Sequence, residues 1–291
     1  MSLRILLTGG SGQVGWELQR TLACLGEVGA PNRAALDLTQ VDSIRQAVRD
    51  WRPDVIVNPA AHTAVDKAES EAELATAINA TAPGILAEEA ARLGALLVHY
   101  STDYVFDGTK ATPYIEDDAA NPQNVYGRTK WAGEQAVRTN SPKHLILRTS
   151  WVYGRRGGNF LLTMQRLMRE RPELKIVADQ IGAPTWSQLI AEATGQILAQ
   201  CLGPARRSDF APWGTYHLTS DGETSWHGFA AAIAELSGID PVPKLSPIPS
   251  SDYPTPAKRP ANSRLSNAKL AATFGLGLPD WRQALELCLG D

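Results

Sequence analysis

The chain has few cysteines, little net charge and no long apolar run, and each scarcity narrows the classes of protein it can be. Only three cysteines occur in 291 residues, Cys24, Cys201 and Cys288, and they are far apart. An odd number of distant cysteines argues against a disulfide framework and suits the reducing cytoplasm. The formal net charge of −3 gives no reason to expect nucleic acid or an acidic membrane surface as a partner.

No stretch of the chain approaches the roughly 18 apolar residues that a membrane span needs, so we expect no membrane-embedded segment. The apolar run after Met1 is too short for the core of a signal peptide, and no small-residue cleavage site follows it. Together with the cysteine pattern, this predicts a cytoplasmic protein. Hydrophobic residues make up 43% of the chain and charged residues 20%, which is typical of a globular protein with one large domain or two intimate ones.

A glycine-rich turn follows the first predicted strand, residues 4–8. Its glycines, Gly9, Gly12 and Gly15, have the spacing G-x-x-G-x-x-G, and an apolar helix face begins at Val14. Glycines let the backbone bend tightly and approach a pyrophosphate, whose charge then lies at the helix N-terminus. A glycine-rich turn without a ligand is the alternative, but the strand before it and the helix after it favour a dinucleotide site.

The residues after the second predicted strand, 27–30, bear on which nicotinamide cofactor is bound. An NAD-specific site places Asp or Glu there, to bind the ribose 2′-hydroxyl. This chain has Asn32 and Arg33 instead, so a 2′-phosphate is not repelled and Arg33 is placed to pair with it. We therefore expect NADPH to be preferred over NADH, unless Arg33 is only a solvated loop charge. Asp37, farther along, either bonds the adenine amino group or helps to cap the predicted helix 41–51.

Two further predicted strands end in small or polar residues. The strand 55–57 runs into Asn58-Pro-Ala-Ala-His-Thr63, where small alanines suit the close passage of a cofactor. The strand 96–100 closes on Thr102 and Asp103. A hydroxyl at this strand end can bind a substrate carbonyl and stabilise the charge that develops on its oxygen, although an N-cap or a turn would use the same residue types.

Tyr126 and Lys130 are the residues around which the chemistry of the chain is predicted. They stand four apart in a predicted helix, 126–140, and therefore share one face, about 6 Å apart along the axis. A free phenol titrates near ~10, and a nearby ammonium favours the phenolate and lowers that pKa, which makes tyrosine a usable acid or base. Such pairs also occur by chance, so the pattern depends on the glycine turn and Thr102 for its context.

Strands and helices alternate along the first half of the chain, which predicts a Rossmann-type, doubly wound parallel sheet of the α/β class. A long helix is expected at 69–93. After residue 154 the pattern loosens into shorter elements, polar loops and a proline-rich run, 241–260. We expect a Rossmann domain from residues 1–153 plus about 186–224, and a smaller, discontinuous α/β substrate lobe from about 154–185 plus 225–291.

With these features in place, the chain resembles the extended short-chain dehydrogenase/reductases and, among them, the dTDP-4-dehydrorhamnose reductase family. The resemblance is carried by motifs that span nearly the whole chain, including the second lobe, where substrate identity is decided. They are Gly9 to Gly15, Asn58 to Glu69, Ser101 to Phe106, Tyr126 to Lys130, Arg148 to Tyr153, Asp179 to Thr185 and Arg259 to Arg264.

The resemblance implies reduction of the C4 ketone of dTDP-4-dehydro-L-rhamnose, with hydride from a nicotinamide and a proton from Tyr126. Lys130 would lower the pKa of that tyrosine and hold the nicotinamide ribose, and Thr102 would bind the sugar carbonyl. The sugar nucleotide would be held by Asp103, Trp151, Thr185 and Arg264. The residues expected to line the cofactor are Gly9, Gly12, Gln13, Val14, Asn32, Arg33, Asp37, Leu38, Ala61, His62 (through its backbone), Thr63, Tyr100, Tyr126 and Lys130.

The family also suggests features that the residues alone do not. Some relatives carry an acidic residue at the position of Asn32, so their cofactor preference does not transfer to this chain. Certain members are described as magnesium-dependent dimers. No carboxylate cluster here has the spacing of a metal site, so Mg²⁺ and a homodimer are suggested by the resemblance only.

Two other functions are compatible with the same fold. One is a nucleotide-sugar epimerase or dehydratase, which keeps NAD bound through turnover, whereas a reductase exchanges its cofactor in each cycle. The other is a non-catalytic regulatory subunit, similar to that of methionine adenosyltransferase, since fold does not fix function. A degenerate subunit would be free to lose its catalytic residues, but this chain has Tyr126, Lys130, Thr102 and Asp103.

Overall fold

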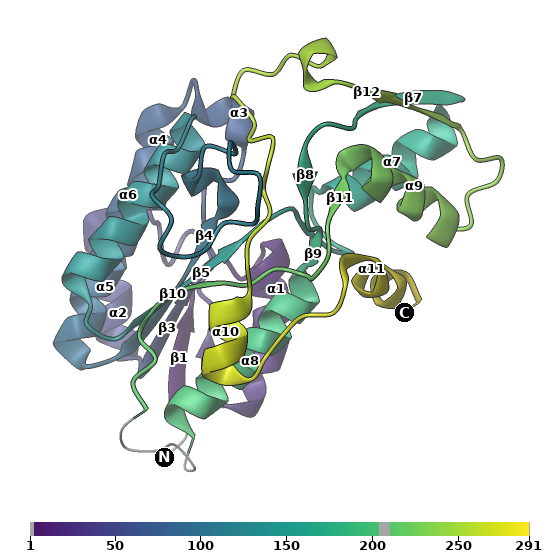
Figure 1. Cartoon of the computed structure of the whole chain (residues 1–291). Coiled ribbons are helices and arrows are strands. Elements are labelled where there is room, and N and C mark those ends of the chain that lie inside the picture. The colour runs from purple at the N-terminus through teal and green to yellow at the C-terminus, as the bar shows by residue number, and fades with distance from the viewer. Residues whose placement is uncertain (1–2, 204–209, 291) are drawn as a thin grey trace.

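A six-stranded parallel sheet forms the centre of the protein (Figure 1) and confirms the predicted Rossmann-type fold. The computed structural model describes residues 3–203 and 210–290. The strand order is β10-β5-β4-β3-β1-β2, so the order reverses between β1 and β3, and ligands of such sheets bind at the carboxyl ends of the strands near that point. The strands are β1 (Leu3–Leu7), β2 (Gly26–Gly29), β3 (Val55–Asn58), β4 (Leu96–Thr102), β5 (His144–Thr149) and β10 (Gly214–His217).

Helices cover both faces of this sheet (Figure 1). On one face lie α1 (Gln13–Thr21), the 3-10 turn η1 (Leu22–Cys24) and α8 (Ser187–Leu202), and on the other α2 (Val41–Trp51), α5 (Ala82–Leu93) and α6 (Val125–Asn140). Ile5 and Leu7 of β1 join the core under α1, while Leu6 joins the core under α2 and α5. Residues 55–57 of β3 and 96–98 of β4 are continuous apolar runs because both faces of these strands are buried. Within the described residues, no helix has the length and apolar character needed to cross a membrane.

The long helix predicted over 69–93 is interrupted, so that prediction is wrong in its details. The chain forms α3 (Val65–Ala68), α4 (Ala72–Thr76), a π-helical turn η2 (Ala77–Thr81) and then α5. A π turn inserts an extra residue into a helix and is frequent at functional sites. Here Asn79 is buried, and its Nδ2 donates to Thr129 Oγ1 of α6 at 3.2 Å. The interruption therefore ties this segment to the helix that carries Tyr126.

The rest of the chain forms a smaller lobe of short strands and helices, at the upper right of Figure 1. Its core is apolar and aromatic, and includes Tyr153, Trp186 and Phe229. β12 lies in the proline-rich run and was not predicted; it forms a two-stranded sheet with β7, so Pro247 removes no central ladder bond. The elements are β6 (Val152–Tyr153), α7 (Phe160–Glu170), β7 (Glu173–Val177), β8 (Ile181–Gly182), β9 (Thr185–Trp186), β11 (Thr224–Ser225), α9 (Trp226–Leu236), β12 (Lys244–Ile248), the 3-10 turn η4 (Ser250–Asp252) and α11 (Trp281–Gly290).

The bounds of the two lobes stay a prediction. Separate core clusters under the sheet and in the small lobe support a division. The C-terminal segment crosses between them, because it runs back from the small lobe along the sheet to α10 (Ala268–Phe274) before α11 returns (Figure 1). Leu270 and Phe274 pack in the core of the sheet lobe. By its packing, α10 therefore belongs with the sheet, although it falls in the predicted range 225–291.

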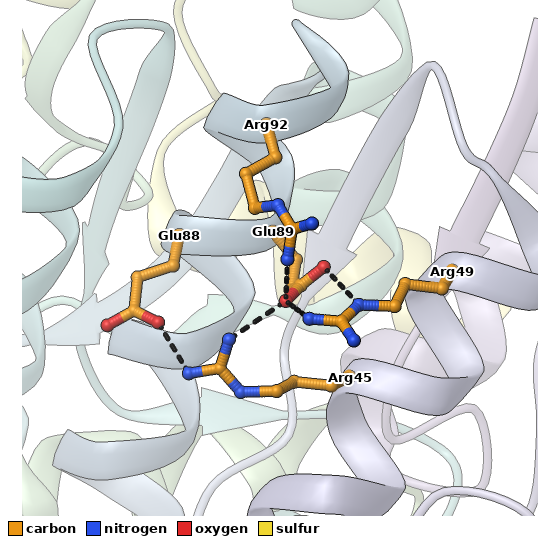
Figure 2. A network of polar contacts seen from close by, with 5 residues as sticks. All are labelled: Arg45, Arg49, Glu88, Glu89 and Arg92. Carbon is orange, nitrogen blue, oxygen red and sulfur yellow. Dashed lines mark hydrogen bonds and ion pairs between the residues drawn. The ribbon is translucent and has the colours of Figure 1, made fainter.

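A buried carboxylate joins α2 to α5 on one face of the sheet. Glu89 is 1% exposed and accepts hydrogen bonds from Arg45 at 3.0 Å, from Arg49 at 2.8 and 3.0 Å and from Arg92 at 3.2 Å (Figure 2). Arg45 also pairs with Glu88 at 2.8 Å. The hydrogen bonding of Arg49 contributes most to a lowered pKa of Glu89. Because the arginines come from both helices, the network fixes their packing.

We expect Glu89→Gln to lower the free energy of unfolding at neutral pH by about 1–3 kcal/mol, because three arginines lose the carboxylate charge that they share. The loss is limited because the arginines remain near solvent. Urea denaturation measures the change. Since the pKa of Glu89 is lowered on folding, its contribution is full above the usual glutamate pKa and is lost as pH falls through the lowered value. The difference between the two proteins should therefore narrow in acid.

Glu88→Gln is the matched control for this prediction. The side chain of Glu88 is partly exposed and pairs with Arg45, so its loss should change stability by less than about 1 kcal/mol. A Glu89→Gln protein as stable as the parent at neutral pH would contradict the role of the network.

Candidate active site

The glycine-rich turn between β1 and α1 is shaped to receive a phosphate group. Gly9 has a φ of +57°, a conformation that favours glycine. A Cβ atom at Gly15 would overlap the carbonyl oxygen of Gly9, so glycine is needed for α1 to pack this closely on the turn. Gly12, at the N-cap of α1, has no side chain to bond the first amides of the helix. Those amides and the helix dipole favour an anion, so the turn fits the pyrophosphate of a dinucleotide.

The segment after β2 lies beside this turn. A Cβ atom at Gly10 would come 3.2 Å from Ala30, which places the end of β2 next to the glycines. Asn32 Oδ1 accepts from two backbone N–H groups of the following loop, at 3.1 and 3.2 Å, so its side chain shapes that loop. Arg33 is exposed. Both residues therefore stand where the adenosine ribose is expected, and their roles stay predictions.

Asp37 does not cap α2, so the capping alternative is wrong. The N-cap residue of α2 is Gln40, and Asp37 Oδ1 instead accepts from the backbone N–H and the hydroxyl of Thr39 at 2.9 and 2.8 Å. These bonds, the backbone one first, lower the pKa of Asp37. Leu38 is partly buried against the core beneath α2. The contact of Asp37 with adenine stays a prediction.

The loop after β3 forms a wall beside the glycine turn. A Cβ atom at Gly9 would come 3.0 Å from Ala60, so the loop up to Thr63 begins against the turn. Asn79 fixes it, because the N–H of His62 donates to Asn79 Oδ1 at 2.8 Å and Asn79 Nδ2 donates to the His62 carbonyl at 3.1 Å. The His62 ring bonds a glutamate carboxylate at 2.8 Å. The predicted role of this loop as a cofactor wall is compatible with these contacts and remains a prediction.

The start of α6 is pressed onto the segment after β4. Asn124, the N-cap residue, accepts the N–H of Gly127 at 2.8 Å. A Cβ atom at Gly127 would overlap the carbonyl oxygen of Tyr104 in the 3-10 turn η3 (Asp103–Val105), so this glycine permits the contact. The rings of Tyr104 and Tyr126 meet edge to face, with centroids 5.4 Å apart. The helix therefore brings Tyr126 to the polar end of β4.

Lys130 is a buried lysine on the same helix. It is 2% exposed and donates from Nζ to the backbone carbonyl oxygen of Tyr100 at 2.6 Å. The Tyr100 hydroxyl bonds Thr194 at 2.7 Å, so Tyr100 meets the lysine with its main chain. Burial lowers the pKa of Lys130 to about 8, and Glu134 opposes this change. At neutral pH the lysine is charged, but close to losing its proton.

A buried ion pair anchors α6 one turn farther along. Arg148 of β5 donates from Nε and Nη2 to the two carboxylate oxygens of Glu134 at 2.8 and 2.7 Å, and both side chains are fully buried. Arg138 adds a contact of 2.8 Å to the same carboxylate. A two-pronged pair of this kind fixes geometry as well as distance, so it sets how α6 presents Tyr126 and Lys130.

The pKa of Tyr126 is raised, which corrects the expectation that Lys130 lowers it. Burial raises this pKa most; a hydrogen bond with Thr102 opposes the change, and the charges of Asp103 and Tyr104 raise it further. Lys130 is not among the groups that shift the pKa of Tyr126. Its Nζ is bonded instead to the main chain of β4. Tyr126 is therefore a neutral phenol at neutral pH, the form that donates a proton to a stronger base such as an alkoxide.

Thr102 is bonded to its neighbours in two ways. Its hydroxyl donates to Asp103 Oδ1 at 3.0 Å and accepts the N–H of Tyr104 at 3.2 Å, so Thr102 forms the turn given above as the alternative to a chemical role. Burial raises the pKa of Asp103 to about 6, although hydrogen bonds with Ser263 and Thr102 lower it. To bind a substrate carbonyl, the Thr102 hydroxyl must rotate from Asp103 toward the ligand, and that role stays a prediction.

The C-terminal segment brings a further cation to the site. Arg259 donates from Nη1 to the hydroxyl of Tyr104 at 3.0 Å and pairs through Nη2 with Asp66 of α3 at 2.7 Å. Burial raises the pKa of Tyr104 to about 12, and Arg259 opposes this. Arg259 thus joins α3, η3 and its own segment beside Tyr126. The sequence marked it only as part of a motif, because its partners are distant along the chain.

Trp151 lies at the junction of the two lobes. Its φ is +48°, and its ring stacks on Trp226 of α9 with centroids 3.6 Å apart. A Cβ atom at Gly182 would come within 2.7 Å of the same ring, so the indole is held flat against the small lobe. The ring is partly exposed. A contact between Trp151 and a sugar nucleotide stays a prediction.

Thr185 and Arg264 use their polar groups within the protein. Thr185 is fully buried, donates to one backbone carbonyl at 3.0 Å and accepts one backbone N–H at 3.2 Å. Arg264 pairs with Glu223 at 2.7 Å and donates to a backbone carbonyl at 2.6 Å, and it lines a cavity of about 510 Å³. Their contacts do not bring them to Tyr126, and their assignment to the substrate remains a prediction.

Comparison with known proteins decides the family. The family model described as the RmlD substrate binding domain matches residues 3–291. A dTDP-4-dehydrorhamnose reductase of Burkholderia thailandensis is 52% identical over 295 residues, with 99% of each chain covered. One from Escherichia coli is 47% identical over 297 residues, with 99% of this chain and 98% of the relative covered. The chain belongs to the dTDP-4-dehydrorhamnose reductase family.

Solved structures of the family have the same fold. The dTDP-4-dehydrorhamnose reductase of Bacillus anthracis, solved in complex with NADP, is 36% identical with a TM-score of 0.92, and 99% of each chain is covered. That of Clostridium acetobutylicum is 40% identical with a TM-score of 0.91, and 98% of each chain is covered. A UDP-glucose 4-epimerase of Thermus thermophilus, 21% identical with a TM-score of 0.80, shares the fold alone.

Proposed function

We propose that this protein reduces the C4 ketone of dTDP-4-dehydro-L-rhamnose to dTDP-L-rhamnose with NADPH. The proposal is carried by a neutral Tyr126 and a buried Lys130 beside Thr102, in a chain 52% identical to a dTDP-4-dehydrorhamnose reductase along 99% of its length. The reaction would be the last step of dTDP-L-rhamnose synthesis, which supplies cell-surface polysaccharide.

NADPH is the cofactor that the residues after β2 favour. Between residues 30 and 36 the chain has no Asp or Glu to repel a 2′-phosphate, and Arg33 is exposed there. The relative from Bacillus anthracis was solved with NADP. We assign the cofactor site to Gly9, Gly12, Gln13, Val14, Asn32, Arg33, Asp37, Leu38, Ala61, His62, Thr63 and Tyr100, together with Tyr126 and Lys130.

In this mechanism bound NADPH would supply the hydride that reduces the C4 carbon. Side chains of the protein protonate the C4 oxygen and donate a hydrogen bond to it. Tyr126 donates its phenolic proton to the C4 oxygen as negative charge builds there. The Thr102 hydroxyl, turned from Asp103, donates a hydrogen bond to the same oxygen. Lys130 holds the nicotinamide ribose with its ammonium group. Asp103 and Trp151 hold the sugar.

Several further expectations rest on the sequence and the family resemblance. They are a cytoplasmic location, assembly into homodimers, a requirement for Mg²⁺, the absence of nucleic-acid and membrane partners, and the lobe bounds given above. Within residues 3–203 and 210–290, no group of three or more His, Cys, Asp or Glu side chains is placed to hold a metal ion. Mg²⁺ therefore stays a hypothesis from the resemblance.

Cofactor exchange separates a reductase from the other functions that fit this fold. We expect the purified protein to carry no tightly bound nicotinamide, and to oxidise NADPH only when dTDP-4-dehydro-L-rhamnose is present. The absorbance spectrum of the purified protein shows whether nicotinamide is bound, and the decrease in NADPH absorbance measures its oxidation. Tightly bound NAD without net NADPH oxidation would favour an epimerase or dehydratase. A stable protein that neither holds NAD nor oxidises NADPH with this substrate would favour a regulatory subunit.

Tyr126→Phe should lower kcat by orders of magnitude, because phenylalanine keeps the ring contact with Tyr104 but has no proton to give. The Kd for NADPH, measured by fluorescence, should stay nearly unchanged. Tyr253→Phe is the matched control, since it removes the hydroxyl of an exposed tyrosine and should keep the parent rate. Near-normal turnover in Tyr126→Phe would remove Tyr126 as the proton donor.

Arg33→Gln should lower kcat/KM for NADPH about tenfold or more, because a charge-assisted bond to the 2′-phosphate is lost. The value for NADH should stay near that of the parent, since NADH has no phosphate at that position. Steady-state kinetics with both cofactors measure the two effects in one protein. A parent enzyme that strongly prefers NADH, or a variant that loses both activities equally, would contradict the role of Arg33.

A further inference from the structure

A row of buried polar side chains runs from Lys130 across three neighbouring strands, β4, β3 and β1, toward the glycine turn. Nζ of Lys130 lies 3.4 Å from Nε2 of His99 in β4. Nδ1 of His99 lies 3.0 Å from Nδ2 of Asn58 in β3, and Asn58 Oδ1 accepts the hydroxyl proton of Thr8, directly after β1, at 2.6 Å. All four residues are at most 2% exposed, so water does not compete for these groups.

Strand pairing holds this row in register. β1 pairs with β3 and β3 with β4, and Asn58 is the direct partner of His99 in the sheet. The row therefore lies at the strand ends where the sheet order reverses, next to the glycine turn that follows Thr8. This is the edge at which ligands of doubly wound sheets bind.

The hydrogen bonds of Thr8 and Asn58 favour one of the two ring nitrogens of His99 as the site of its proton. Because the Thr8 hydroxyl donates to Asn58 Oδ1, the amide nitrogen of Asn58 faces His99. An amide nitrogen only donates, so Nδ1 of His99 accepts and the proton of the neutral ring lies on Nε2. Burial and then the charge of Lys130 lower the pKa of His99 well below its usual value, against a hydrogen bond with the main chain of Asn58 that raises it, so the ring is neutral.

The N–H at Nε2 of His99 faces a lysine that already donates to the Tyr100 carbonyl. An ammonium group has three donors and no acceptor, so a charged Lys130 cannot accept this N–H, and its other two N–H groups are best directed away from His99. A neutral amine has a lone pair that does accept it. His99 therefore restricts the charged form of Lys130 and stabilises the neutral form.

We propose that His99 is a positioning residue for Lys130, held by Thr8 and Asn58 with its proton on Nε2. It turns the free N–H groups of the charged lysine away from the sheet, and it makes the lysine easier to deprotonate. The part of this inference that concerns turnover rests on the proposed function. The part that concerns the proton on His99 does not.

Other ionisable groups near Lys130 have separate effects. Glu134, one turn along α6, raises the pKa of Lys130 and is itself bound to Arg148. The π turn contributes Asn79, which is uncharged. Within the described part of the chain, ionisable groups that other elements bring to α6 include His99 of β4, Asp103 and Tyr104 of η3 and Arg148 of β5, and Glu69 accepts the N–H of Val125 at the start of the helix.

The tautomer of His99 is measured directly by two-bond ¹H–¹⁵N spectra of protein labelled with ¹⁵N-histidine. Signals are assigned by comparison with variants that each lack one histidine. We expect a neutral ring with its proton on Nε2 from about pH 6 to 9. A proton on Nδ1, or a charged ring, would overturn the proposal. This measurement uses the parent protein and does not depend on turnover.

The effect on Lys130 is measured with His99→Phe, which removes the N–H and keeps an aromatic ring. In the parent, kcat/KM for NADPH-dependent reduction should fall above about pH 8, where Lys130 loses its charge. In the variant this basic limb should move up by about one pH unit, because the bond that stabilises the neutral lysine is gone. NMR titration of Lys130 without substrate should show the same shift.

His144→Phe is the matched control, since His144 lies at the opposite end of the sheet, at the start of β5, and bonds the Ser141 carbonyl at 2.6 Å. Its basic limb should not move. A lower melting temperature or rate in His99→Phe with an unmoved limb would show a structural role and overturn the proposal. If that variant does not fold, the tautomer of the parent decides. A parent that does not reduce the sugar overturns the proposed function, whereas the spectra still test His99.

Discussion

The hydrogen bond from Nζ of Lys130 to the carbonyl oxygen of Tyr100 is the contact on which the candidate site depends. An unpaired lysine in this position would be strongly unfavourable, so the bond requires α6 to lie tightly on the end of β4. Gly127 lets the helix touch η3 at one point, and the buried pair of Glu134 with Arg148 fixes its rotation at another. The same placement brings Tyr126 to the polar strand end.

Burial then acts on the two catalytic candidates in opposite directions. It disfavours the charged form of each, so the pKa of Tyr126 rises while that of Lys130 falls to about 8. At neutral pH the tyrosine keeps its proton and the lysine is still charged. That is the state a reductase needs of its tyrosine, because the phenol must give a proton to the C4 oxygen.

Local patterns predicted the parts of this protein that depend on neighbours in the chain. The glycine spacing from Gly9 to Gly15 indicated the turn, and the apolar runs indicated the strands of a doubly wound sheet. The pair Tyr126 and Lys130 was placed on one helix by spacing alone. The motifs of the family extended this to both lobes, and comparison with known proteins confirmed the family.

The features that sequence could not predict depend on distant contacts or on burial. Spacing suggested that Lys130 acts on Tyr126, but the bond of its Nζ to β4 follows from how α6 packs. The π turn at Asn79 follows from its contacts with His62 and α6. The row that includes His99 is assembled from three strands that are far apart in the chain. The sign of this row in the sequence was His99, a polar residue in the otherwise apolar predicted strand 96–100.

In the proposed mechanism, hydride reaches C4 of the sugar while Tyr126 protonates the C4 oxygen. The most direct measurement uses NADPH deuterated at both positions of the nicotinamide C4, with dTDP-4-dehydro-L-rhamnose as substrate and NMR of the product. We expect dTDP-L-rhamnose with one deuterium at C4 for each NADPH oxidised. Deuterium at another carbon, or a sugar product formed without NADPH oxidation, would contradict it.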